Sequence, residues 1–310
     1  MRASASPAVA VVVVGALMAA GVYVVAVLDR LVASVVASRR PAWSAALAAP
    51  AAAAALLVMQ RRRSTERPDA VGWALAPALL AGLAAVALAM VPFAPDLSVA
   101  DPATGFVIFA AAIAFVMIAV FLHGWSPNSA LPLLGAYRYG AQGLSLQMPF
   151  LLAMLATALP AESLAITDIV EAQRSLWNVV RQPLGLPLYA VVGVGVAFWG
   201  PLNLPDGADI AGGTTVESSG AALLAWEVAR AGMLVAVAAM GAAVFLGGWW
   251  GPWLPGPVWM LVKTLMLVAV LVGTGHLLAR VRIEPFVVVA WAVLIPSALV
   301  NVFVAGATLL

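Results

Sequence analysis

Long uninterrupted runs of apolar residues dominate the chain, and polar residues fall mainly between them. A helix needs about 20 apolar residues to cross roughly 30 Å of hydrocarbon. Alternating apolar and polar positions, the mark of membrane β-barrels, are absent, and helices satisfy their own backbone polar groups. The pattern predicts an all-α polytopic membrane protein with a single membrane domain over residues 1–310. Its eight expected spans cover residues 7–28, 72–93, 104–123, 131–158, 184–200, 220–247, 257–279 and 285–308.

The composition agrees with a chain that faces lipid. Of 310 residues, 65% are hydrophobic and 9% are charged, whereas a soluble domain carries about 25% charged residues. The net charge of +2 gives no indication of nucleic-acid binding. The first apolar run follows Arg2, as the core of a signal peptide would, but no soluble domain follows it. We expect it to be the first spanning helix and not a cleaved leader.

A shorter run at residues 43–59 is ambiguous. It is almost entirely alanine, is interrupted by Pro50 and is followed by Arg61, Arg62 and Arg63. Alanine contributes little transfer energy, and arginines anchor a helix to an anionic membrane surface. The run is either an interfacial helix or a ninth span, and we favour the interfacial helix.

The basic residues divide unequally between the two sets of loops. With eight spans, nine arginines fall on one side and three on the other, and the richer side is expected in the cytoplasm. This places both termini on the outer side of the cell inner membrane. The richer set is Arg30, Arg39, Arg40, Arg61, Arg62, Arg63, Arg67, Arg280 and Arg282; the poorer set is Arg2, Arg174 and Arg181.

The residue inventory argues against resident metal chemistry. The chain has no cysteine, which excludes disulfides, cysteine-ligated zinc and cysteine-held iron–sulfur clusters. The histidines are His123 and His276. A haem would require these two to meet, and we favour packed or interfacial histidines instead.

A few charged residues fall within or at the mouths of the expected spans, where a charge costs at least about 2.5–3.5 kcal/mol. They are Arg138, Glu227, Arg230 and Lys263. Glu227 and Arg230 are three residues apart and can pair on one helix face; the pair either only neutralises itself or takes part in function. Lys263 has no acid nearby in sequence, so it needs a partner on another helix or a cavity.

The loop at residues 201–219 is the most acidic and least hydrophobic stretch. It contains Asp206, Asp209 and Glu217 among several glycines. It is either an ordinary solvated loop or, because its acids oppose the positive trend of this side, a docking surface or charged cavity.

Five segments in order resemble the H-type membrane subunit of proton-pumping NADH-quinone oxidoreductase, the family of complex I subunit 1. The same fold serves the membrane subunit of energy-converting hydrogenases. The segments are 124–142 (GWSPNSALPLLGAYRYGAQ), 167–179 (TDIVEAQRSLWNV), 203–220 (NLPDGADIAGGTTVESSG), 247–264 (GGWWGPWLPGPVWMLVKT) and 280–284 (RVRIE). They are similar to the family's GWSSNS…LLGALRAAAQ, TDIV…Q…WNV, DLPE…EYSG, FGGWxGP…LKT and RPRYD. The likeness runs from about residue 75 to the end.

The resemblance implies eight spanning helices plus a surface-lying helix after the first. It implies a non-redox subunit that forms, with its neighbours, a chamber for lipid quinone and couples quinone reduction to proton movement. NADH, FMN and iron–sulfur clusters would belong to partner subunits, namely a peripheral arm and antiporter-like membrane subunits. On this reading the quinone chamber contains Arg138, Asp206, Asp209 and Glu217; the charge relay contains Glu227, Arg230 and Lys263; and the cytoplasmic loop contacts are Asp29, Arg30, Arg280, Arg282 and Glu284.

The chain departs from the family pattern where protons would move. Gln147 replaces the glutamate of the family's SYE motif, Asp206 and Asp209 are what remains of an acid-rich stretch, and Arg230 stands where the family has an acid. A carboxylate relays protons because its pKa can be tuned, whereas glutamine cannot ionise. The chain therefore reads as a divergent paralogue.

Three alternatives stay open. The first is the membrane anchor of a hydrogenase-like complex, which gene neighbours would distinguish. The second is a structural paralogue that has lost proton coupling, which the missing acids favour. The third is an independent transporter, which the absence of an internal repeat disfavours.

Overall fold

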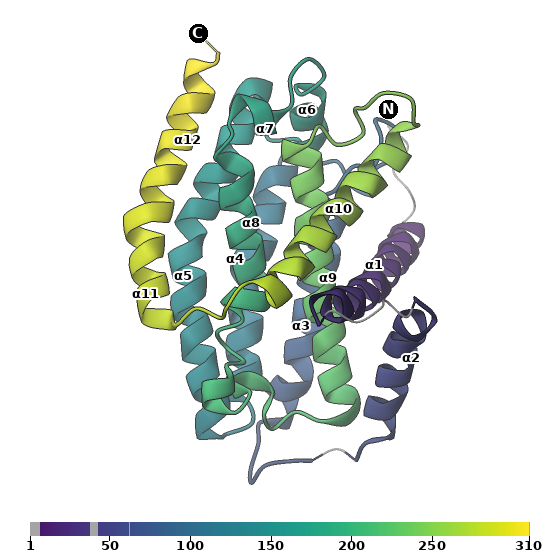
Figure 1. Ribbon diagram of the computed structural model, residues 1–310, viewed down its shortest axis with the longest axis vertical. Helices are drawn as coiled ribbons and strands as arrows, with labels where there is room; N and C mark the ends of the chain where they lie inside the picture. Colours follow the sequence, from purple (N-terminus) through teal and green to yellow (C-terminus); the bar gives the residue numbers. More distant parts are fainter. Residues whose placement is uncertain (1–6, 38–42, 62, 310) are drawn as a thin grey trace.

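The computed structural model describes residues 7–37, 43–61 and 63–309, and in these residues it is helical throughout apart from turns and one isolated bridge between Ala94 and Leu97. The all-α prediction is confirmed. The main helices are α1 (Pro7–Val36), α2 (Trp43–Met59), α3 (Ala70–Ala89), α4 (Gly105–Trp125), α5 (Ala130–Ala158), α8 (Gly185–Val196), α9 (Gly220–Phe245), α10 (Gly256–Leu277), α11 (Ile283–Val289) and α12 (Ile295–Ala307) (Figure 1). Two short helices, α6 (Ile166–Glu171) and α7 (Asn178–Arg181), lie in the connection between α5 and α8.

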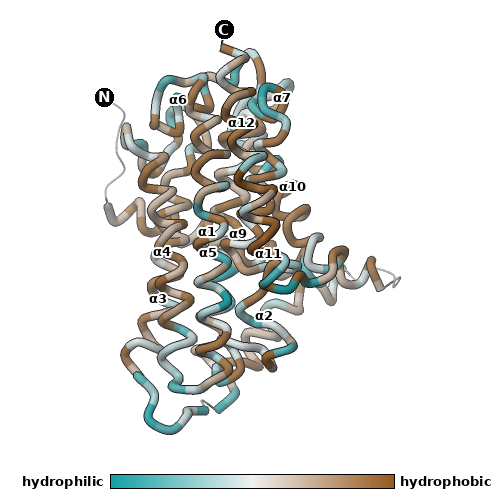
Figure 2. The backbone as a smooth tube through the Cα atoms, turned by 90° about the vertical axis from the view of Figure 1, so that its left-hand side faces the viewer, coloured by the Kyte–Doolittle hydropathy of each residue, from teal (hydrophilic) through white to brown (hydrophobic). Residues whose placement is uncertain are grey.

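Among the described residues, seven helices are long and apolar enough to span a membrane. They are α1, α3, α4, α5, α9, α10 and the continuous stretch 283–307, in which α11 and α12 are joined through a π-helical segment. Figure 2 shows hydrophobic residues along the middle of the bundle and hydrophilic stretches in the connections at its ends. The chain is a polytopic membrane protein.

The expected span 184–200 differs in length, because α8 has only 12 residues, a rise of about 18 Å. The helix ends where Phe198 and Gly200 take positive φ angles of 37° and 50°. A Cβ on Gly200 would lie 2.7 Å from the Cα of Gly275 in α10. This close approach requires glycine, and the turn directs the chain into the loop below α8.

Helix α9 lies at the centre of the bundle. It packs against α1, α2, α3, α8 and α10, and every residue from Ala231 to Phe245 is buried. Small residues allow this: a Cβ on Gly241 would lie 2.8 Å from the Tyr189 ring of α8. Close helix packing through Gly and Ala is typical of membrane bundles.

Helix α2 packs against α1 and α9. Its 17 residues rise about 26 Å, short of the roughly 30 Å that a perpendicular span requires. Its interfacial position stays a prediction.

The lower end of the bundle in Figure 1 gathers the loops that follow α2, α4 and α8. The Arg63 backbone N–H donates to Ser219 Oγ (2.9 Å), and Arg280 Nη1 donates to the Asp206 carbonyl (3.1 Å). Arg63 and Arg280 therefore contact the same loop, and the side of the membrane on which this loop lies stays a prediction. Four arginines used in that topology, Arg2, Arg39, Arg40 and Arg62, lie outside the described residues.

Candidate functional site

The loop between α8 and α9 buries an ion pair beneath the bundle. The Asp206 carboxylate is 7% exposed and lies 3.5 Å from Arg230 Nη1, and it accepts a hydrogen bond from Thr214 Oγ1 at 2.5 Å. With its amide oriented to satisfy both neighbours, Asn203 donates to Asp206 Oδ2 (3.2 Å) and to the Phe198 carbonyl (3.1 Å). Burial raises the pKa of Asp206 to about 6, although Arg230 and the Thr214 hydroxyl act in the opposite direction.

Arg230 of α9 contacts both this loop and a neighbouring residue of its own helix. Its guanidinium lies 4.8 Å from the Trp199 ring centroid and 5.3 Å from that of Phe198. Its Nη1 is also 3.5 Å from Glu227 Oε1. Two carboxylates and two aromatic faces thus compensate the desolvation of one buried cation.

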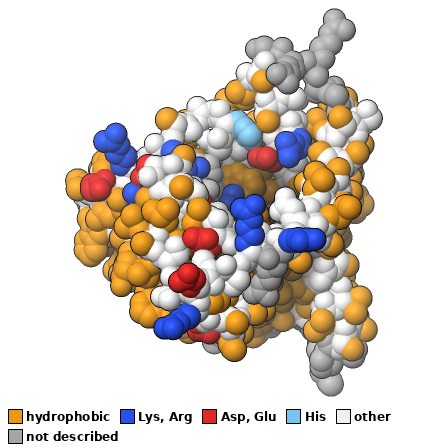
Figure 3. All heavy atoms as spheres, turned by 90° about the horizontal axis from the view of Figure 1, so that it is seen from below, with side chains coloured by type: hydrophobic (Ala, Val, Ile, Leu, Met, Phe, Trp, Pro, Cys, Tyr) orange, Lys and Arg blue, Asp and Glu red, His pale blue; other side chains and the backbone are white. Residues whose placement is uncertain are grey.

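A cavity of about 560 Å³ opens beside this cluster between α1, α2 and α9. Its wall is mostly apolar, with the polar groups of Asp29, Arg30 and Glu227 and the ring of Trp199 among its lining residues. Figure 3, viewed from below, shows a hollow whose rim carries acidic, basic and histidine side chains. The apolar lining consists of Ala19, Val22, Val25, Ala26, Ala49, Pro50, Ala51, Ala53, Ala54, Leu57, Leu224, Val228 and Ala231, with Tyr23 beside them.

His276 of α10 contacts α1 at the edge of this cavity. Its Nε2 lies 2.9 Å from Asp29 Oδ1 of α1. His123 has a separate environment: its Nε2 lies 3.2 Å from Ser218 Oγ, and its ring stacks on Trp226 at 3.8 Å between centroids. The two histidines thus have different partners on different helices, and the arrangement offers no paired axial ligands.

The four residues expected in the quinone chamber separate into three environments. Asp206 lies in the buried ion pair described above. Arg138 Nη2 and Asp209 Oδ2 form a bridge of 2.6 Å that ties α5 to the loop, and this bond lowers the pKa of Asp209. Glu217 accepts from Ser129 Oγ (3.0 Å) and lines a second, polar cavity of about 490 Å³ together with Arg61 and Arg63.

Of the five residues expected to make cytoplasmic loop contacts, two lie in α1 and not in a loop. Asp29 and Arg30 belong to α1 and line the cavity of about 560 Å³. Arg280 contacts the loop through the Asp206 carbonyl, while Arg282 and Glu284 are exposed where α11 begins.

The expected relay residues do not form one group. Glu227 and Arg230 are in contact, but Lys263 lies near the opposite end of the bundle, in the first turns of α10. Lys263 Nζ donates to the carbonyls of Gly248 (2.9 Å) and Trp250 (2.6 Å) and lies 4.1 Å from the Trp177 ring centroid.

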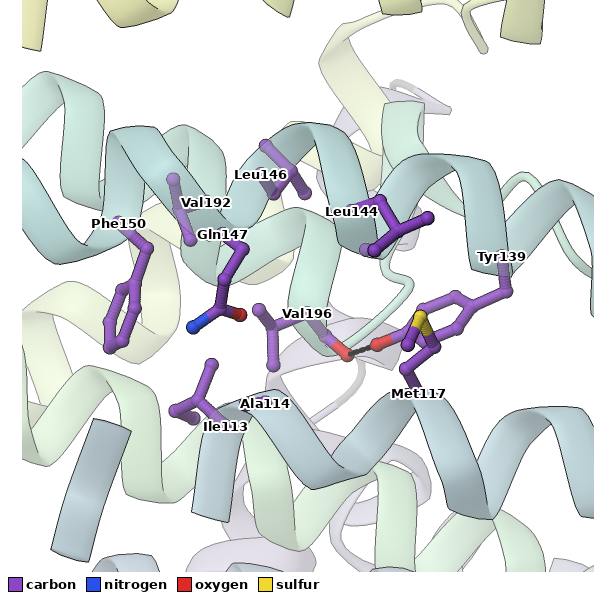
Figure 4. Close-up of a pocket in the computed structure, with 11 residues that line it drawn as sticks. Ile113, Ala114, Met117, Tyr139, Leu144, Leu146, Gln147, Phe150, Val192 and Val196 are labelled. Atoms are coloured by element: carbon purple, nitrogen blue, oxygen red, sulfur yellow. Dashed lines mark hydrogen bonds between the residues drawn. The ribbon is translucent and has the colours of Figure 1, made fainter. Parts of the chain in front are cut away.

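Gln147 points into a small cavity between α4, α5 and α8 (Figure 4). The cavity has a volume of about 110 Å³, and its neighbours include Ile113, Phe150 and Val192. Tyr139, at its other end, donates to the Val196 carbonyl at 2.8 Å. No carboxylate occurs among its lining residues, so the cavity around Gln147 is uncharged.

Sequence reasoning missed Trp199, Tyr23 and the role of His276 at the cavity edge. Trp199 falls at the end of an expected span, and aromatic residues are common at that depth, so no sequence signal separates it from an interfacial anchor. Within the described residues, no group of three or more His, Cys, Asp or Glu side chains could hold a metal ion.

Comparisons with known proteins identify the family and several relatives of the chain. Residues 8–306 match the family model described as NADH dehydrogenase. The chain is 33% identical to the H 1 subunit of NADH-quinone oxidoreductase from Rhodopseudomonas palustris (strain BisA53) over 239 residues, which cover 77% of this chain and 75% of that protein. It is 30% identical, with the same coverage, to the H 2 subunit of NADH-quinone oxidoreductase from Rhodopseudomonas palustris (strain ATCC BAA-98 / CGA009).

Proposed function

The chain belongs to the NADH dehydrogenase family (subunit 1), and from this premise we propose that it forms part of the quinone chamber of a multi-subunit NADH-quinone oxidoreductase. Reduction of a quinone to a quinol takes up two electrons and two protons. The electrons would come from NADH through FMN and iron–sulfur clusters in partner subunits, since this chain has no cysteine.

One observation carries the proposal: the cavity of about 560 Å³ between α1, α2 and α9 combines an apolar wall with charged groups. Ligand sites of this size are mostly apolar with few polar groups that fix orientation. The apolar wall suits an isoprenoid tail. The edge with Asp29, Arg30, Glu227 and Trp199 suits a quinone head on its way to the peripheral arm.

Proton coupling would begin at the same edge. Asp206, whose pKa is raised to about 6, changes charge close to neutral pH and is linked to Glu227 through Arg230. A quinol or quinone that alters the field at Glu227 would therefore change the proton affinity of Asp206. The proposed relay consists of Asp206, Arg230 and Glu227, and it leaves out Lys263, which contacts a different loop.

A second candidate function is that of a structural paralogue without proton coupling. It is favoured by Gln147 in its uncharged cavity and by the apolar half of α9, Ala231–Phe245, which contains no ionisable residue. A hydrogenase-like anchor would share the fold but would copurify with nickel–iron subunits.

The proposed setting is the cytoplasmic membrane of a bacterium. The lower end of the bundle, with Arg63 and Arg280, would face the cytoplasm and the peripheral arm, and both termini would lie outside. Purification in mild detergent should yield the chain bound to partner subunits; a stable monomer with transport activity of its own would contradict this.

Filling the cavity tests the chamber. Ala54 of α2 lines it, and the next residue, Ala55, is exposed and does not. In the assembled complex, Ala54→Phe should raise the KM for quinone several-fold, whereas Ala55→Phe should leave it unchanged. Equal kinetics for the two variants would refute the chamber. Pumped protons per NADH, measured in vesicles, then decide between coupling and its loss.

A further inference from the structure

A second apolar groove lies on another side of the molecule, between α8, α10 and α11. Helix α10 packs on α9 and α1, whereas α11 and α12 pack on α5. Figure 1 shows α10 leaning away from α11 and α12, and the short α8 contacts α5 and α9 between them. The groove is open because α10 diverges from α11 and α12, and because α8, which lies between them, is short.

The groove has a volume of about 410 Å³ and offers almost no polar group. The hydroxyl of Thr274, the one polar side chain among its lining residues, already donates to the Leu271 carbonyl at 2.7 Å. An occupant of this space must therefore be hydrocarbon. The lining consists of Ala190, Val191, Val194, Pro201, Leu202, Val270, Leu271, Thr274, Leu278, Val281, Pro285, Phe286, Val289 and Leu294.

Two arginines lie at the lower end of this groove. Leu278 and Val281 line it, and Arg280 and Arg282 flank Val281 in the link to α11. Arg280 uses Nη1 to hold the Asp206 carbonyl, which fixes its position. The side chain of Arg282 is exposed and has no hydrogen bond or ion pair with any residue that the structure describes, while its carbonyl accepts from the Phe286 backbone N–H (3.2 Å). One acid, the exposed Glu284, lies nearby in sequence. The carboxylates of Asp206 and Asp209 interact with Arg280, so Arg282 is the arginine of the link that remains available to a headgroup.

We propose that this groove binds an anionic phospholipid, with one acyl chain between α8, α10 and α11 and the phosphate against Arg282. Lipid tails are as apolar as the groove, so the tail supplies fit and the headgroup supplies selectivity. Basic pockets between spanning helices on the cytoplasmic side are typical binding places for anionic headgroups. A partner helix with its side chains would need a channel some 10–12 Å wide, whereas an acyl chain is much narrower.

The site is separate from the quinone cavity, because the lining residues of the two do not overlap. The inference rests on the membrane fold and not on the proposed redox role.

Photocrosslinking in the intact complex tests the proposal. Val289 lines the groove and is 45% exposed; Val300 of α12 is 51% exposed and lies outside it. Each is replaced by benzoylphenylalanine in complexes reconstituted into an equal mixture of phosphatidylglycerol and phosphatidylethanolamine. After irradiation, mass spectrometry identifies the attached molecule. We expect phosphatidylglycerol to predominate at position 289 and the two lipids to react equally at position 300.

Charge variants supply the second arm. Each arginine near the surface should contribute about a fivefold preference. Arg282→Gln should reduce the preference at position 289 by about that factor, Arg282→Lys should retain it, and Arg67→Gln, an exposed charge on another loop, should leave it unchanged. Equal attachment of both lipids at position 289, or attachment to a partner subunit, would overturn the proposal.

Discussion

Arg230, whose side chain is 13% exposed, and Lys263, which is buried, are cations in neighbouring helices with surroundings of opposite kinds. Arg230 lies between Asp206 and Glu227, beside the cavity of about 560 Å³. Lys263 is held by two backbone carbonyls and the Trp177 ring. An intramembrane charge is usually functional, but for these two cations the chemistry of the partner determines whether the charge can take part in proton transfer. A carboxylate can change its protonation state, whereas a carbonyl can only hold the cation.

Removing Arg230 should give the largest effect. Arg230→Met leaves Asp206 and Glu227 without their cation, and breaking a buried pair in this way costs about 3–5 kcal/mol. We expect poor assembly and quinone reduction lowered by at least two orders of magnitude. The double variant Arg230→Met with Asp206→Asn removes both charges and should recover much of the assembly; no recovery would mean that the pair does not stabilise the fold.

Replacing Asp206 should change the pH profile. The pKa of Asp206 is raised to about 6 in the folded protein, so the folded state binds this proton more tightly than the unfolded state. The resulting contribution to the free energy of unfolding is complete below about pH 4 and is lost as the pH rises through 6. Asp206→Asn should therefore gain thermal stability relative to the parent above pH 6, and should abolish a transition near pH 6 in the quinone reduction rate. A parent profile that is flat between pH 5 and 7 would contradict the assignment.

Lys263→Met should show the contrasting behaviour. It removes two hydrogen bonds and a cation–π contact that hold residues 248–250, so we expect a Tm lower by a few degrees, equivalent to about 2 kcal/mol. Pumped protons per NADH in the assembled complex should stay at the parent value. Fewer pumped protons per NADH with an unchanged Tm would indicate that Lys263 takes part in the relay.

The smallest effect is expected at His276. Its bond to Asp29 joins α10 to α1 at the cavity edge, but the side chains are 22% and 40% exposed, so the pair contributes less than about 1 kcal/mol. His276→Ala should raise the KM for quinone about twofold without changing the Tm measurably. A large fall in kcat at constant KM would indicate a role in the chemistry instead.

The length and apolarity of the runs were sufficient to predict an all-α membrane bundle, because lipid allows few other solutions for a chain of this kind. Local spacing also predicted the contact between Glu227 and Arg230, which share a helix face. Other partners are farther away in sequence: Asp29 and His276 are 247 residues apart, and Asp206 and Arg230 are 24 apart. Lys263 bonds to carbonyls 15 and 13 residues before it. No periodicity in the sequence predicts these pairs.

The sequence by itself therefore determined that the chain lies in lipid, that it is helical and which side chains pair at short range. Hydrophobic length and helical spacing are local properties of the sequence. Only the tertiary structure decided that α8 ends early at Val196, before the turn in which Gly200 touches Gly275, and that α1, α2 and α9 enclose a cavity. Both depend on how closely distant helices approach one another, which is a property of the packed bundle and not of any one segment.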